Sequence, residues 1–309
     1  MPGQNETHVN SFSNLLLINP SFAGLDKNTR FHTGDQFYFI SENEAFNNFY
    51  VTYDTYSDKL KGGIGFYFQQ GLIGELNTST NELGFTYAGF PVHTKNGNII
   101  FSLNVNALVA TKQWYVFMLE EIVNNNQEES NPTVDEFNPY FLLKPRLGIL
   151  GNMKTFRWGL AAEFPLKKEM NTAVDEEVIK SENLPFGLSL YLSKKIDGNE
   201  KGLESKPFNA YPELIVFYNK NFMIGRIRLI KDYIDKSFGL FLQSDITNNI
   251  HAVGGTIGLR KKNIRINLTS GVGIPVVSDN IAFTGELSLS LIIPPIHYSE
   301  INPWSPQRK

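Results

Sequence analysis

The chain has 309 residues, a formal net charge of -3 and no cysteine. A near-neutral charge argues against a nucleic-acid partner, and the lack of cysteine excludes disulfides and thiolate metal sites. No stretch approaches the roughly 18 apolar residues of a transmembrane helix. A membrane β-barrel stays open, because half of the residues in each of its strands can be polar.

The first feature in chain order is an apolar stretch, LLLINPSFAG, at 15–24. The preceding MPGQNETH lacks the basic and apolar regions of a signal peptide, so we expect this numbering to describe an exported protein with its signal peptide absent. Pro20 restrains Asn19 to extended geometry, and Gly24 permits a turn. We expect residues 1–28 to form an ordered N-terminal segment that caps or plugs the periplasmic mouth of a barrel.

From residue 29 onward, apolar and polar residues alternate with a period of two, which is typical of strands with two unlike faces. In FTGELSLSLI, Leu287 and Leu289 share one face, whereas Glu286 and Ser288 share the other. Most such segments have about the ten residues that cross a bilayer as a tilted strand. The fourteen segments lie near 29–40, 47–57, 60–71, 76–89, 97–112, 139–150, 155–164, 184–195, 209–219, 222–231, 236–246, 249–260, 262–273 and 282–293.

The connections between these segments alternate in length. Those at 113–138 and 165–183 are long and polar, whereas SDK, GNMKT, DYID and RKKN are tight; only 196–207 is too long for its class. Long extracellular loops and short periplasmic turns give a barrel this parity. The sequence therefore predicts an all-β fold, a transmembrane antiparallel β-barrel of about 14 strands at 29–293, followed by a Pro-rich periplasmic tail at 294–309.

The polar face of the strands carries charges of both signs, which we expect to line the lumen. Because a lone buried charge is costly and a paired one is tolerated, we expect a cross-linked, largely filled lumen, with Arg265 and Glu286 as one pair. The outward face should consist of Phe, Leu, Ile, Val, Gly and Ala. The predicted lumen charge network comprises Arg30, Arg146, Arg157, Glu163, Glu213, Arg226, Arg228, Arg265 and Glu286, and the same face includes Asp54, Lys61, Glu82, Lys144 and Asp245.

Candidate catalytic and metal-binding groups are sparse. The five histidines do not lie at ligand spacing with one another or with acidic residues. His251 could face Ser237 or Ser244 on a neighbouring strand, but no nucleophile elbow accompanies them. GGTIG at 254–258 and GVGIP at 271–275 lack the features of phosphate loops, and the acidic residues at 128–129 and 175–177 lack calcium-loop order. We expect no enzyme activity, no metal and no cofactor.

The stretch INPSFAG resembles the Asn-Pro-Ala-Tyr/Phe-Ala-Gly signature that opens the mature chains of the PorP/SprF family, outer-membrane barrels of the type IX secretion system of Bacteroidetes. Ser21 stands where Ala is usual, and Arg30 takes the place of an Arg in the family's first strand. The family's aromatic-Arg-Asn-Gln-Trp run is replaced here by FHTGDQFYF. The matching residues are Asn19, Pro20, Phe22, Ala23 and Gly24.

This resemblance implies a non-enzymatic role in protein secretion at the bacterial outer membrane. Family members look like either a core accessory of the machinery or a dedicated partner of one secreted adhesin, and the altered run after Arg30 favours the second. The implied partners are the C-terminal domain of an adhesin or other type IX cargo, periplasmic type IX components and the lipid bilayer. Anchoring such an adhesin would support gliding or attachment. The alternatives are an outer-membrane channel or transporter for hydrophobic or small solutes, and a soluble all-β binding protein.

Overall fold

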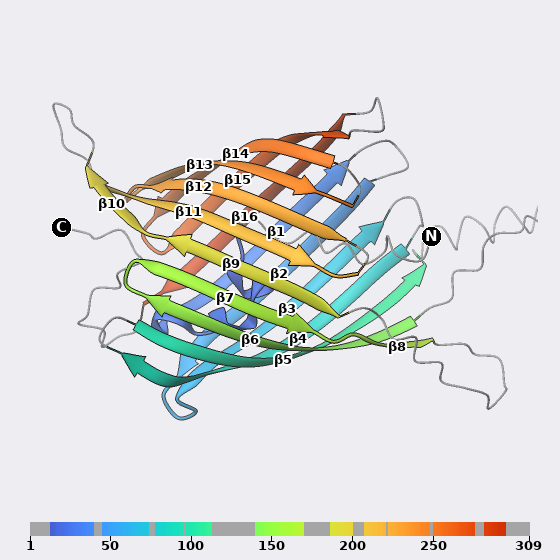
Figure 1. Ribbon diagram of the computed structural model, residues 1–309, viewed down its shortest axis with the longest axis horizontal. Helices are drawn as coiled ribbons and strands as arrows, with labels where there is room; N and C mark the ends of the chain where they lie inside the picture. Colours follow the sequence, from blue (N-terminus) through green and yellow to red (C-terminus); the bar gives the residue numbers. More distant parts are fainter. Residues whose placement is uncertain are drawn as a thin grey trace, which may run out of the picture.

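The computed structural model describes residues 13–39, 45–73, 78–94, 97–112, 140–169, 186–199, 207–220, 222–247, 250–275 and 281–294. Its strands form one antiparallel sheet of sixteen segments. Two segments are short: β8 pairs β6, as β7 does before it, and β10 pairs β11, as β9 does before it. The remaining fourteen close into a barrel through the pairs β16–β1 and β9–β11 (Figure 1).

The strands have the following bounds. The first eight are β1 (Thr29–Phe39), β2 (Ala45–Ser57), β3 (Gly62–Ile73), β4 (Thr78–Thr94), β5 (Gly97–Lys112), β6 (Tyr140–Met153), β7 (Phe156–Glu163) and β8 (Leu166–Glu169). The others are β9 (Gly187–Lys194), β10 (Ile196–Asn199), β11 (Pro207–Tyr218), β12 (Met223–Asp232), β13 (Lys236–Asp245), β14 (Ile250–Lys261), β15 (Ile264–Pro275) and β16 (Ala282–Ile293).

The predicted all-β barrel of fourteen strands is confirmed, with local differences. Strand β4 runs on to Thr94, past a register shift between Gly89 and Val92, where the sequence predicted an end near residue 89. The connection at 196–207 is long because its first residues form β10, which continues the hairpin against β11 from Ile196↔Ala210 to Asn199↔Pro207. Among the described residues, no helix has the length and apolarity to cross a membrane.

The two mouths of the barrel differ. The short turns at 58–61, 154–155, 233–235 and 262–263 gather at one mouth, on the left in Figure 1, where β1 also begins and β16 ends. The long connections open at the other mouth. Because outer-membrane barrels place short turns in the periplasm, we assign the short-turn mouth to that side. The predicted loop at 113–138 and the tail from residue 295 lie outside the described residues, as do residues 170–183 of the predicted loop at 165–183. That loop begins later than predicted, because Leu166–Glu169 form β8 against β6.

The two faces of the wall alternate as the sequence predicts. On β13, Leu240 and Leu242 are 70% and 60% exposed, whereas Ser237 and Phe241 are each 2% exposed. An apolar outward face of this extent suits hydrocarbon, because soluble monomers rarely expose large contiguous apolar patches. The expected outward composition is wrong in detail, however: Asp35 and Ser270 also lie on that face.

Leu289 provides a test of the outward face. It is 41% exposed near the middle of β16, between Thr33 and Ile266 of the neighbouring strands. Leu289→Arg should lower the free energy of unfolding in lipid vesicles by roughly 2–4 kcal/mol, because it places a guanidinium in hydrocarbon. The depth control Ile274→Arg, one residue from the end of β15, should cost about 0–1 kcal/mol. Equal costs at both depths would contradict the assignment of the membrane-embedded band.

Asp35 should show the opposite effect. Its exposed carboxylate lies between Leu287 of β16 and Phe49 of β2, and it forms no hydrogen bond or ion pair with any described residue. A charged group costs free energy on the lipid face, less for Asp than for Lys or Arg. Asp35→Leu should therefore raise the free energy of unfolding by about 1–2 kcal/mol in urea titrations of vesicle-embedded protein. A destabilised Asp35→Leu barrel would show that this carboxylate has a favourable partner.

Candidate functional site

Residues 13–27 lie inside the barrel, where Figure 1 shows them in dark blue between the front and back walls. They form α1 (Leu15–Ile18), η2 (Pro20–Phe22) and η3 (Leu25–Lys27). The Asn14 side chain accepts a hydrogen bond from the Leu16 amide and caps α1. Asn19 is extended, with φ of −147°, and its side chain accepts from the Ser21 amide at 2.9 Å to start η2. Asn thus caps the first two of these short helices, whereas η3 follows Gly24 and has no side-chain cap.

The apolar side of this segment packs on an apolar strip of the inner wall. Ile18, Phe22 and Ala23 have no exposed surface. The ring of Phe22 meets Tyr191 edge to face at 5.1 Å between centroids. The wall contributes inward-facing side chains from five strands to the same cluster: Ala88, Ile100, Leu150, Tyr191 and Ile215. Such side chains are out of place in a water-filled lumen, and they match the segment that covers them.

Three arginines of the wall hold this segment by its backbone and its one acidic side chain. Arg146 donates to the carbonyl of Leu17 at 2.9 Å and to that of Ile18, and Arg30 donates to the carbonyl of Phe22. The last carbonyls of a short helix have no donor within the helix, and these guanidinium groups supply the missing hydrogen-bond donors. Arg157 pairs with Asp26 at 3.1 Å between Nη2 and Oδ2.

Asn19 and Gly24 bring the segment into direct contact with the backbone of the wall. The amide nitrogen of the Asn19 side chain donates to the carbonyls of Ile149 at 3.2 Å and Leu160 at 3.0 Å. Gly24 has φ of +62°, and its amide donates to Asp54 at 2.8 Å. A Cβ on Gly63 of β3 would lie 1.9 Å from the carbonyl oxygen of Ala23, so the wall must also have glycine here.

Among the remaining predicted lumen charges, Glu213, Arg226 and Arg228 have partners within the wall. Glu213 accepts from Arg228, with Nε at 2.6 Å, and the two residues face each other in the strand register. Arg226 donates to Gln243 at 2.6 and 2.9 Å. Glu163 lies opposite Arg146 in the register, but its carboxylate forms no hydrogen bond with a described residue.

Two expectations about the lumen charges are wrong. Arg265 does not pair with Glu286: it contacts Asp232 at 3.2 Å and Ser237 at 2.8 Å instead. The register explains this, because Arg265 faces Ser290, four residues along β16 from Glu286. Lys61 is not in the lumen either. It is exposed in the turn between β2 and β3, where its φ is +48°.

A pattern that sequence reasoning missed links three inward tyrosines to three glutamates. The hydroxyl groups of Tyr50, Tyr67 and Tyr191 donate to Glu286, Glu82 and Glu213 respectively, each at 3.0 Å. Lys144 completes the Glu82 site at 2.6 Å. Each tyrosine stands at an inward position of its strand, which was the available signal. Ser13 and Asp26, which reach Glu286 and Arg157, precede the strands and gave no such signal.

The model of one protein family matches residues 3–268, and its description is "Type IX secretion system membrane protein PorP/SprF". The chain belongs to the PorP/SprF family. This family assignment places the protein in type IX secretion and, with the fold, in the bacterial outer membrane as a β-barrel. No curated protein matches the sequence.

Solved structures that resemble this PorP/SprF protein share little sequence with it. CdiB from Acinetobacter baumannii is 8% identical with a TM-score of 0.47, and the match covers 85% of this chain and 60% of CdiB. The toluene transporter TodX from Pseudomonas putida is 12% identical with a TM-score of 0.46 over 92% of this chain and 94% of TodX. The KdgM porin is 8% identical with a TM-score of 0.36 over 84% and 98%.

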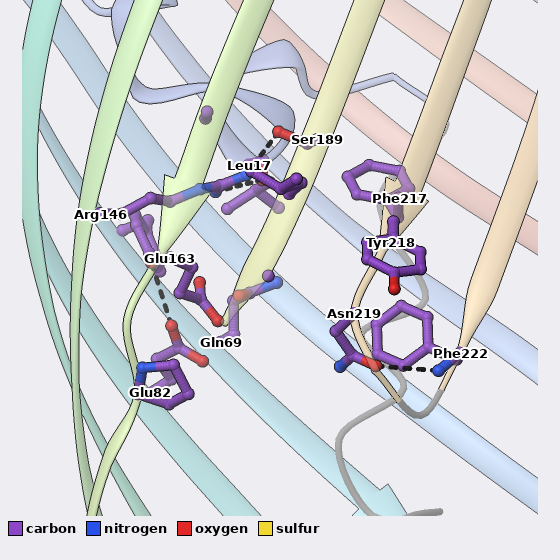
Figure 2. Close-up of a pocket in the computed structure, with 15 residues that line it drawn as sticks. Leu17, Gln69, Glu82, Arg146, Glu163, Ser189, Phe217, Tyr218, Asn219 and Phe222 are labelled. Atoms are coloured by element: carbon purple, nitrogen blue, oxygen red, sulfur yellow. Dashed lines mark hydrogen bonds between the residues drawn. The ribbon is translucent and has the colours of Figure 1, made fainter. Parts of the chain in front are cut away.

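A small cavity lies next to the enclosed segment of this PorP/SprF protein, towards the long-loop mouth (Figure 2). It has a volume of about 70 Å³, with Leu17 and Arg146 at its inner end and Phe217, Asn219 and Phe222 at another side. Glu82 and Glu163 also line it. The cavity therefore lies between the enclosed segment and the connection from β11 to β12.

The wall of this PorP/SprF protein also contains the serine–histidine pair that the sequence suggested. Ser244 Oγ lies 2.9 Å from His251 Nδ1 on the outward face, where the two residues face each other in the register. Neither residue has another hydrogen-bond partner among the described residues, so the third member of a hydrolase triad is missing there. The described residues also contain no cluster of three or more His, Cys, Asp or Glu side chains that could hold a metal ion.

Proposed function

We propose that this chain is a non-enzymatic outer-membrane component of type IX secretion that binds the C-terminal domain of a secreted adhesin and anchors it at the cell surface. Such anchoring would support attachment or gliding. The observation that carries this proposal is the place of the family motif inside the lumen. Asn19, Phe22 and Ala23 are 0–1% exposed there, and Pro20 is buried beside them. A motif in that place serves the barrel interior.

The enclosed segment supports an anchoring role over a transport role. We infer that residues 13–27 act as a plug, because they contact strands on several sides of the lumen through apolar, backbone and ionic interactions. A barrel wall that is packed and hydrogen-bonded to an enclosed segment changes shape little when a partner pulls on it. The solute-transporter alternative needs a continuous path, and this segment stands in it.

The long-loop mouth is the proposed docking side. It faces the cell exterior under the usual orientation of outer-membrane barrels, and its inner end holds the cavity lined by Phe217 and Phe222. Aromatic side chains of this kind are common anchors in protein interfaces. Periplasmic type IX components are the proposed partners of the opposite, short-turn mouth, where β1 begins and β16 ends.

Copurification tests the proposal. The tagged full chain, extracted from outer membranes, should retain a secreted protein, and the purified C-terminal domain of that protein should bind the purified barrel directly. Phe222→Asp, at the long-loop mouth, should weaken binding of the purified domain. Lys59→Glu, exposed in a short turn, should leave it unchanged. A folded barrel that fails to bind the purified domain, or that loses binding with Lys59→Glu only, would overturn the proposed role or its side.

A further inference from the structure

The outward wall contains a hollow that interrupts its otherwise convex apolar surface. It has a volume of about 560 Å³ and spans β12 to β15. Two rows of outward residues, aligned by the strand register, line it. One row is Lys231, Phe238, Ile257 and Leu268, and the other is Leu229, Leu240, Gly255 and Ser270.

Gly255 creates the hollow. Its neighbours in the row include Leu240, which is 70% exposed, and the adjacent Ile257 is 55% exposed. A Cβ on Gly255 would meet only the Gly239 carbonyl at 3.4 Å and a Leu240 methyl at 3.9 Å, both ordinary contacts. Packing of the wall therefore does not require glycine at this position. The missing side chain leaves a gap between long aliphatic side chains, with the shape that a hydrocarbon chain would fill.

The end of the hollow nearest the short turns is basic and aromatic. The ammonium of Lys231 lies 4.1 Å from the ring centre of Phe208 and 5.3 Å from that of Tyr233. The ammonium of Lys236 lies 5.7 Å from the Tyr233 ring and 5.8 Å from the Phe238 ring. Both ammonium groups thus lie within 6 Å of the centre of the Tyr233 ring, at this end of the hollow.

The charges around this end favour an anion. The outward residues of the adjoining strand ends include Lys261, which is exposed. Asp232 points into the lumen, where it pairs with Arg260 and Arg265, and Asp235 lies in the turn between β12 and β13. The lysines lie at the short-turn mouth, which faces the periplasmic leaflet of the outer membrane. Phosphate groups of lipids are the anions at that depth.

We propose that this hollow is a binding site for a glycerophospholipid of the periplasmic leaflet. One acyl chain lies in the gap over Gly255, between Leu240 and Ile257. The phosphate lies between the ammonium groups of Lys231 and Lys236. The apolar gap and the two lysines are adjacent, as the acyl chain and the phosphate of a phospholipid are. A diacylglycerol, which lacks the phosphate, can fill the gap but cannot pair with the lysines.

Native mass spectrometry of the full chain, titrated with phosphatidylglycerol, phosphatidylethanolamine or diacylglycerol, tests this site. Both phospholipids should bind with one tight site, and diacylglycerol should bind weakly. Lys231→Gln/Lys236→Gln should lower phospholipid affinity roughly thirtyfold, because each lysine near a lipid phosphate contributes about a factor of five. Gly255→Leu, which fills the gap, should weaken phospholipid and diacylglycerol alike.

Two matched variants complete the experiment. Gly225→Leu lies on the outward face of β12, where nothing approaches within 4 Å, and should leave lipid affinity unchanged. Lys59→Gln/Lys194→Gln removes two exposed lysines at the same mouth, away from the hollow, and should also leave it unchanged. Equal loss in the two double-lysine variants would show general attraction of lipids to a basic rim, and unchanged affinity in Gly255→Leu would show that no chain occupies the gap. Either result would overturn the proposal.

Discussion

Deletion of residues 1–27 should convert a closed barrel into one with large, stable conductance in planar bilayers. The strands pair only with one another, and β1 begins at Thr29, so the wall should still assemble. The deletion removes Leu16, Ile18 and Phe22 from the lumen and frees Arg30 and Arg146 from the carbonyls that they hold. Water can then fill the space that these side chains occupied.

The same deletion should lower stability. Burial of each large apolar side chain contributes about 1.5–3 kcal/mol, and the entropy of ordering the segment offsets part of that gain. The apolar wall residues Ile100, Leu150 and Ile215 would also face water. The midpoint of urea unfolding in lipid vesicles should therefore fall, together with retention of the secreted partner.

Deletion of residues 1–12 is the matched control, because it leaves residues 13–27 intact and should give little steady conductance. Large openings in the full chain would contradict the plug and support the solute-transporter alternative. A silent barrel after deletion of residues 1–27 would show that another part of the chain closes the lumen.

The sequence predicted the wall well because its information is local. A period-two pattern such as that around Leu287 and Leu289 fixes which face of a strand meets hydrocarbon, and the parity of connection lengths fixes the order of strands. Strands that follow one another in sequence then pair as antiparallel neighbours in the barrel. The inward placement of Arg146, Glu213 and Glu286 follows from the same pattern.

The sequence could not predict which inward groups meet. Arg265 and Glu286 lie on adjacent strands and on the same face, yet the register separates them, and a register is set by turns and tilt along the whole barrel. The contacts of residues 13–27 were equally inaccessible. Asp26 reaches Arg157 across 131 positions of sequence, and no local pattern links these residues. Asp35 was missed because one polar residue in an outward row does not break the alternation around it.

Arg228→Met should destabilise the barrel by about 3–5 kcal/mol, since it leaves the Glu213 carboxylate in the lumen without its cation. The pair is enclosed, at 6% and 8% side-chain exposure, and the guanidinium meets the carboxylate through two nitrogens. Arg226, the nearest other cation along β12, is held by Gln243. Tyr191 keeps its hydrogen bond to Glu213 but supplies no charge.

The double variant Arg228→Met/Glu213→Gln separates the cost of an unpaired charge from the value of the pair. Removing both charges should recover much of the stability, because breaking a buried pair costs more than replacing it. The reference is Asp197→Asn, which removes the partner of Lys195 where Asp197 is 70% exposed and should cost about 0–1 kcal/mol. Urea unfolding in vesicles measures the stability of all three variants. An unchanged slope of the unfolding free energy against urea concentration shows that the variants can be compared as two-state systems. If Arg228→Met cost no more than Asp197→Asn, water would reach Glu213 in the closed lumen, and the plug would have to admit solvent along β11 and β12.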